Sequence, residues 1–174
     1  MKYTQKLRIS FKDIGLFFLI TLLISSCGFH LRGDIVLPPL YERVYIVDKG
    51  ESGIGRSLSL ALKRVGSEIV SDTKSATAVV TVLSDGTQRR ALNVGGNQIR
   101  EYELQLDILF VVQDQTGQQL AEPEKVTILR NFQNDPNNVL GKDNEEDIIR
   151  QEMIQPAIIQ VLRRMKAIAD NDAN

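Results

Sequence analysis

The stretch from Ile99 to Gln113 reads IREYELQLDILFVVQ, and its pattern decides how the rest of the chain folds. Its apolar side chains recur at every second position: Tyr102, Leu104, Leu106, Ile108, Phe110 and Val112. A period of two over this length predicts a β-strand with one buried face. Residues 114–117 (DQTG) are typical of a tight turn, so a second strand over about residues 118–132 is expected to pair with the first. The sequence therefore predicts a long β-hairpin.

Further strands are predicted before this hairpin. Residues 41–47 (YERVYIV) are rich in β-branched and aromatic side chains, and residues 68–70 are expected to begin a short strand. Residues 76–84 (ATAVVTVLS) are apolar on both faces, which favours a central strand. Asp85 and Gly86 are predicted to form a turn, and residues 87–94 then extend a strand or form a loop.

The first of two predicted helices covers residues 54–65. Its apolar side chains fall on one helical face, which predicts an amphipathic helix packed on a sheet. Ser52 is the candidate N-cap, and Gly66 stands where a helix commonly ends in a left-handed residue.

The second predicted helix covers residues 144–169, where apolar side chains recur at spacings of four and three. Asp143 and Glu146 resemble a capping box at its start. Pro156 lies inside the pattern and is predicted to kink the helix near residue 152 or to divide it.

Together these segments predict an α+β fold. The order is strand, helix, strands, long hairpin and helix, and each helix is apolar on one side only. We therefore expect a small mixed or antiparallel sheet with two helices packed on one of its faces.

The N-terminal segment has the features of a secretory signal. Four basic residues lie within residues 2–12, and the apolar run of residues 14–24 is only 11 residues long. That run is too short to span a bilayer, which takes about 20 apolar residues, and it suits a signal peptide. We expect residues 1–26 to be removed.

Residues 24–27 (ISSC) resemble a bacterial lipobox, in which the cysteine is acylated and the signal is cut before it. Cys27 is therefore the predicted lipidation site, and two or more acyl chains give stable anchoring. In such lipoproteins an Asp after the cysteine favours the inner membrane, so Gly28 indicates the outer membrane. The expected organisation is a lipidated tether over residues 27–40, one domain over residues 41–170 and a polar tail over residues 171–174.

Composition excludes several classes of function. The full chain has 174 residues with 21 basic against 22 acidic side chains, and the expected mature chain has 17 against 21. A nucleic-acid-binding protein would show a basic excess. The chain has one cysteine and one histidine, so a disulfide, a Cys₄ zinc site and a histidine triad are not expected. We expect no enzymatic activity, no metal and no cofactor other than the lipid on Cys27.

Four basic residues are candidates for binding an anionic ligand. Arg89 and Arg90 follow the predicted turn at Asp85, and Arg100 begins the long strand. Lys142 lies just before the predicted second helix, where unpaired N–H groups favour an anion. A solvated surface lysine is the alternative interpretation of Lys142.

Several motifs resemble the family of lipopolysaccharide-assembly lipoproteins, LptE. Residues 27–33 (CGFHLRG) resemble the start of the mature family members. Residues 130–132 (RNF), the Asp135–Pro136 pair and residues 140–147 (LGKDNEED) resemble the segment before their last helix, and Glu101–Tyr102 resembles the start of their long strand.

The resemblance implies a fold of a small sheet with two helices and a non-enzymatic function. Proteins of this family are expected to occupy the lumen of a large outer-membrane β-barrel, LptD, on the periplasmic side. There they help the barrel to assemble and help to deliver lipopolysaccharide to the cell surface. Lys142 matches the basic residue that the family uses for lipopolysaccharide. The family's second basic position falls in residues 93–98, which contain no cation, so Arg89, Arg90 and Arg100 are candidates by proximity.

Two other functions remain open at this level. A different outer-membrane lipoprotein adaptor, such as a secretin pilotin, would share the anchor and the small fold. A hydrolase would need a pair of carboxylates in a cleft, for which the acidic residues 143–147 are the best local cluster, although acidic residues also stabilise a helix start.

Overall fold

The computed structural model describes residues 35–95, 98–133 and 139–172 of the chain. The elements in chain order are the 3₁₀ turn η1 (Pro39–Tyr41), β1 (Arg43–Asp48), α2 (Ile54–Arg64), β2 (Glu68–Ile69), β3 (Ala78–Gly95), β4 (Gln98–Asp114), β5 (Glu124–Gln133) and α3 (Val139–Asp172). All of them belong to one compact unit that begins at Ile35.

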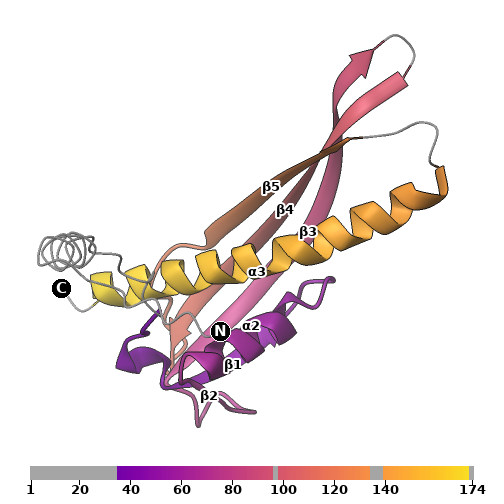
Figure 1. The fold of residues 1–174 in the computed structure, drawn as a ribbon. Coiled ribbons are helices and arrows are strands. Elements are labelled where there is room, and N and C mark those ends of the chain that lie inside the picture. The colour runs from indigo at the N-terminus through magenta and orange to yellow at the C-terminus, as the bar shows by residue number, and fades with distance from the viewer. Residues whose placement is uncertain (1–34, 96–97, 134–138, 173–174) are drawn as a thin grey trace, which may run out of the picture. The chain divides into compact units, whose positions relative to one another are not determined.

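The five strands form one mixed sheet in the order β2–β1–β3–β4–β5. β1 pairs in parallel with β2 and β3, whereas β4 pairs antiparallel with β3 and β5. The predicted hairpin of β4 and β5 is confirmed, although β5 begins only at Glu124. β3 and β4 have 18 and 17 residues, and their pairing continues past the last β4–β5 pair, Glu101 with Gln133 (Figure 1).

Both α-helices cover the same face of this sheet (Figure 1). α3 runs along the strands, and α2 lies beside the part of the sheet that contains β1 and β2. The buried side chains of β4 are those of the predicted apolar face: Leu104, Leu106, Ile108, Phe110 and Val112. They meet α2 through Leu58 and Leu62 and α3 through Ile158, Val161 and Met165 in a single core cluster. The expected α+β fold with two helices on one face is therefore confirmed.

The predicted turn at Asp85–Gly86 is wrong, because β3 continues through both residues. A β-bulge shifts the register between Val82 and Ser84. An extra residue at a bulge reverses which side of the sheet the following side chains face. Asp85 Oδ1 then accepts the N–H groups of Glu51 and Ser52 in the loop before α2. A turn-forming residue is tolerated in this strand because its carboxylate holds a neighbouring loop.

The start of α2 also differs from the prediction. Gly53, in the left-handed conformation with φ of 71°, is the N-cap, and Ser52 is not. The orphan N–H of Gly55 is instead satisfied by Asp48 Oδ2 at 2.9 Å, from the end of β1. The predicted helix end is confirmed, since Gly66 follows α2 with φ of 98°.

α3 begins four residues before Asp143, so the predicted capping box of Asp143 and Glu146 is wrong. The helix then runs without interruption through Pro156 to Asp172, and the predicted division does not occur. Apolar side chains on both sides of the proline, including Met153, Ala157 and Ile158, are buried against the sheet. Their burial holds the helix against the sheet on both sides of the proline despite the missing N–H.

The lead-in to β1 is bound to the end of α3. Tyr41, predicted to begin a strand, lies in η1, and its hydroxyl donates to the carbonyl oxygen of Met165 at 2.7 Å. Ile35, Leu37 and Leu40 pack against the core. Within the part of the chain that the structure describes, neither α-helix is apolar enough over a sufficient length to cross a membrane.

Candidate functional site

The four candidate cations lie on three elements of the fold. Arg89 and Arg90 belong to β3, Arg100 to β4 and Lys142 to α3, of which it is the fourth residue. Lys142 was predicted to precede this helix, and it lies inside it because the helix begins at Val139. The side chains of Arg100 and Lys142, and the predicted lipidation site Cys27, lie outside the described residues.

Arg89 and Arg90 face opposite sides of the sheet. Arg89 stands opposite Leu104, whose side chain is in the core beneath the helices, and Arg90 stands opposite Glu103 on the other face. Successive residues of a strand always alternate in this way. The sequence therefore suggested one cluster of two arginines, and the sheet divides it into two different environments.

On the helix face, Arg89 is bound to α3. Its Nη1 lies 2.8 Å from Oε2 of Glu146, and its guanidinium carbon lies 5.0 Å from the ring centroid of Tyr102. The Tyr102 ring in turn stacks on Phe132 of β5, with centroids 5.5 Å apart. A guanidinium over an aromatic ring gains a cation–π attraction in addition to its ion pair.

Glu146 binds a second arginine from its own helix. The guanidinium of Arg150 donates from Nε and Nη2 to Oε1, so each carboxylate oxygen has its own cationic partner. Glu146 is only 6% exposed, whereas the side chains of Arg89 and Arg150 are 44% and 40% exposed. The cluster is a buried acid with two half-exposed bases and carries one net positive charge.

Burial alone would raise the pKa of the Glu146 carboxyl, because it penalises the charged form. The hydrogen bonds from Arg150 and Arg89, together with their charges, outweigh this effect, and the pKa lies below its ordinary value. Glu146 is therefore ionised at neutral pH, and the cluster stays intact.

On the open face, Arg90 forms an ion pair with Glu103. Its Nη2 lies 2.7 Å from Glu103 Oε1, and its side chain is 70% exposed while that of Glu103 is 11% exposed. Lys125 and Asp107 form a second ion pair farther along the same face, at 3.1 Å. The hydrogen bond from Thr127 and this lysine lower the pKa of Asp107 against the opposing effect of burial.

Glu146 and Arg150 are the residues that the sequence interpretation missed. Their spacing of four on a helix is a pattern for an ion pair, and it was visible in the sequence. Glu146 instead suggested a helix cap, because the helix start could not be placed at Val139. The contact with Arg89 joins residues 57 positions apart, and no local pattern predicts it.

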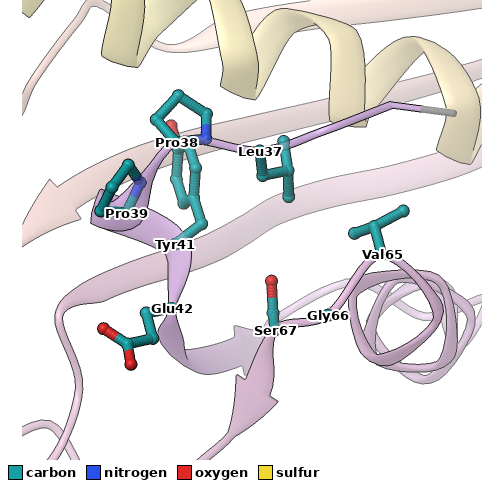
Figure 2. A pocket seen from close by; sticks show the side chains of 8 residues that line it. All are labelled: Leu37, Pro38, Pro39, Tyr41, Glu42, Val65, Gly66 and Ser67. Atoms are coloured by element: carbon teal, nitrogen blue, oxygen red, sulfur yellow. The ribbon is translucent and has the colours of Figure 1, made fainter. Parts of the chain in front are cut away.

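Two hollows of the surface are lined by residues other than Arg89 and Arg90. The first, of about 330 Å³, separates the lead-in at Leu37–Glu42 from the turn Val65–Ser67 after α2 (Figure 2). The second, of about 290 Å³, lies beside the β3 bulge and is lined by Asp85, Asp107 and Lys125 among others. Carboxylates line both, so neither suits a phosphorylated ligand. In residues 35–95, 98–133 and 139–172, no three His, Cys, Asp or Glu side chains are grouped as metal ligands would be.

A family model described as lipopolysaccharide-assembly, LptE, matches residues 41–165. The chain belongs to the LptE family. Among curated LptE relatives, the LPS-assembly lipoprotein LptE of Pectobacterium atrosepticum is 31% identical over 162 residues, which cover 89% of this chain and 83% of the relative. The LptE protein of Photorhabdus laumondii is 25% identical, with 89% and 84% covered.

Solved structures of bacterial lipoproteins share the fold of this chain. A lipoprotein B from Nitrosomonas europaea has a TM-score of 0.70 at 25% identity and covers 82% of this chain and 93% of its own. The rare lipoprotein B from Shewanella oneidensis has a TM-score of 0.67 at 22% identity, with 76% and 99% covered, and it shows the fold alone. The sheet with two helices is thus shared among lipoproteins whose sequences have diverged widely from this LptE chain.

Proposed function

We propose that this chain is an outer-membrane lipoprotein that occupies and helps to assemble an LptD-type β-barrel and assists lipopolysaccharide delivery to the cell surface. The observation that carries the proposal is the family match over residues 41–165, which spans every strand and both α-helices in whole or in large part. The name of its relatives, LPS-assembly lipoprotein LptE, supports lipopolysaccharide as the cargo.

In this proposal residues 1–26 are removed, Cys27 carries the lipid, residues 27–40 form the tether and residues 41–170 the domain. The domain then works on the periplasmic side, inside the barrel lumen, without enzymatic activity or a metal. A rigid sheet covered by helices on one face suits a plug, because shape complementarity requires little internal motion. The two ion pairs on the open face provide polar contacts for a barrel interior.

Lipopolysaccharide binding is assigned in the proposal to Lys142, with Arg89, Arg90 and Arg100 as further candidates. Lys142 begins α3, and Arg100 and Arg89 belong to the two long strands next to that end of the helix. Guanidinium and ammonium groups bind phosphates through charge-assisted hydrogen bonds. Arg89 and Arg90 are paired with carboxylates, so a phosphate would compete with Glu146 and Glu103 for them. Lys142 leads the assignment because it matches the basic residue of the family motif.

The test is co-purification from detergent-solubilised outer membranes through an affinity tag on this chain. A large outer-membrane barrel is expected in stoichiometric amount, and depletion of the chain is expected to leave that barrel misassembled. Recovery of a secretin or another assembly machine in its place would replace the proposal with an adaptor function. Normal barrel insertion in depleted cells would also overturn it.

The ligand assignment is tested with Lys142→Asp, which is expected to weaken binding of purified lipopolysaccharide while the circular dichroism spectrum stays unchanged. Replacement of a cation by an anion adds repulsion to the loss of the contact. An unchanged affinity would remove Lys142 from the site.

A further inference from the structure

We propose that Glu146 is a positioning residue for lipopolysaccharide binding, since it fastens the start of α3 to the β3–β4 hairpin. The inference rests on the proposed function, and it adds a residue that touches no ligand. Its evidence is the cluster that Glu146 forms with Arg89, Arg150 and Tyr102.

The carboxylate of Glu146 connects two separate parts of the fold. Oε2 accepts from Arg89 of β3 at 2.8 Å, and Oε1 accepts from Arg150 one turn later on α3. Arg89 lies over Tyr102 of β4, and Tyr102 stacks on Phe132 of β5. One buried acid therefore ties the first part of α3 to all three strands of the extended end of the sheet.

Burial of the Glu146 carboxylate carries a desolvation penalty, which only closely placed charged donors offset. A carboxylate that is 6% exposed must be compensated by close charged donors, and here each of its oxygens has one. Loss of the Arg89 contact would leave one buried carboxylate oxygen without its charged donor, so this contact favours one position of the helix relative to β3. Buried polar contacts of this kind serve to fix a register.

Lys142 lies one helical turn before Glu146 in the backbone of α3. The position of that turn relative to β3 and β4, and hence to Arg100, is set by the nearest fixed contact along the helix. Among the described side chains of α3, Glu146 is the first that bonds to the sheet. A misplacement of about 1 Å at a binding group is enough to lose most of its contribution.

Electrostatics and positioning predict opposite changes in lipopolysaccharide affinity when Glu146 is neutralised. Glu146 is an anion near a site for an anionic ligand, so its neutralisation would strengthen binding if charge alone acted. If Glu146 positions the cations, its neutralisation weakens binding although the site becomes more positive.

The experiment measures the affinity of the full lipidated chain in detergent for purified bis-phosphorylated lipopolysaccharide. Glu146→Gln is expected to bind about fivefold to tenfold more weakly. Glu145→Gln, the neighbouring exposed glutamate on the same helix, makes the same change in net charge and is expected to bind equally or more tightly. Glu146→Asp keeps the charge but shortens the side chain, so a weaker affinity in this variant also supports positioning if Glu146→Gln does not fold.

A double-mutant cycle with Lys142→Ala completes the test. If Glu146 acts through Lys142, Glu146→Gln has little further effect in the Lys142→Ala background, whereas a merely structural effect would persist there. Wild-type affinity in both Glu146 variants, or full additivity with Lys142→Ala, would overturn the inference. Absence of lipopolysaccharide binding by the wild type, or an unchanged affinity of Lys142→Ala, would instead contradict the proposed ligand site itself.

Discussion

Arg89 and Arg90 are adjacent in the sequence and have different surroundings in the structure. Arg89 pairs with the buried Glu146 of α3, and Arg90 pairs with Glu103 on the open face. Their separation follows from the alternation of side chains along β3. At the scale of the residue, the environment of each charge depends on the side of the sheet that it faces, and the bulge before Asp85 sets that side.

The lowered pKa of Glu146 makes the unfolding free energy of the chain depend on pH. Its pKa is below the ordinary value of 4.5 in the folded chain, so below about that pH the unfolded chain takes up a proton before the folded chain does. This contribution is complete above pH 4.5 and is lost as the pH falls through the folded pKa. We predict that the unfolding free energy of Glu146→Gln falls less steeply than that of the wild type as the pH is lowered from 7 to 3. Chemical denaturation at a series of pH values measures this acid limb of the stability curve.

At pH 7 the same variant should lose about 1–3 kcal/mol of unfolding free energy, the usual cost of a broken buried hydrogen-bonded charge. The exposed neighbour serves as the control, and Glu145→Gln should keep the wild-type acid limb. Parallel curves for the wild type and Glu146→Gln would contradict the prediction.

At the scale of the element, β4 and α3 both follow their sequence patterns but extend beyond the predicted limits. β4 runs from Gln98 to Asp114 with its predicted face buried. α3 begins before Asp143. It continues through Pro156 because its buried neighbours Met153, Ala157 and Ile158 hold this part of the helix against the sheet.

The apolar face of β4 is tested by Leu106→Asp. Leu106 is 2% exposed in the core beneath the helices, and a buried unpaired carboxylate costs several kcal/mol, so this variant should not fold. Leu129→Asp on the paired strand β5 makes the same change at a side chain that is 47% exposed, and it should fold. Far-ultraviolet circular dichroism and thermal denaturation distinguish the two; a folded Leu106→Asp would show that this face is not the core.

Pro156 is predicted to weaken α3. It lacks the N–H that a helix interior needs, so Pro156→Ala should raise the unfolding free energy by about 1–3 kcal/mol. Gln155→Ala, at an exposed position in the same turn, changes only the helix propensity and should have an effect below about 0.5 kcal/mol. A destabilised Pro156→Ala in urea denaturation would mean that the core requires the shape imposed by the proline.

At the scale of the whole molecule, the chain forms one sheet with one core, and its lead-in takes part in that core. Ile35, Leu37 and Leu40 pack against it, and Tyr41 donates to the carbonyl of Met165 near the other end of the chain. These contacts join the end of the expected tether to the C-terminal part of α3.

The contribution of the lead-in is tested by two truncated, unlipidated chains. A chain that starts at Tyr41 lacks the three packed side chains and should be less stable by about 2–4 kcal/mol than one that starts at Ile35, on the scale of partial burial of aliphatic groups. Equal stability of the two chains in urea denaturation would place the domain boundary at Tyr41, as the sequence predicts.

The sequence by itself determined the elements of this protein. The period of two in residues 99–113 predicts β4, the helical spacing predicts α2 and α3, and the residues before Cys27 predict a lipoprotein signal. These patterns are local, because a strand or helix that buries one face must repeat its apolar residues at the period of its own backbone.

Only the tertiary structure decided where the charged side chains of the candidate site lie. The bulge after Val82 determines which face of the sheet Arg89 occupies. Because α3 begins at Val139, Glu146 lies inside the helix, where it pairs with Arg89 and does not cap the helix start. The two residues are 57 positions apart, and their contact depends on strand register and helix placement together. Register and placement are consequences of packing the whole core, and no segment of the sequence contains them on its own.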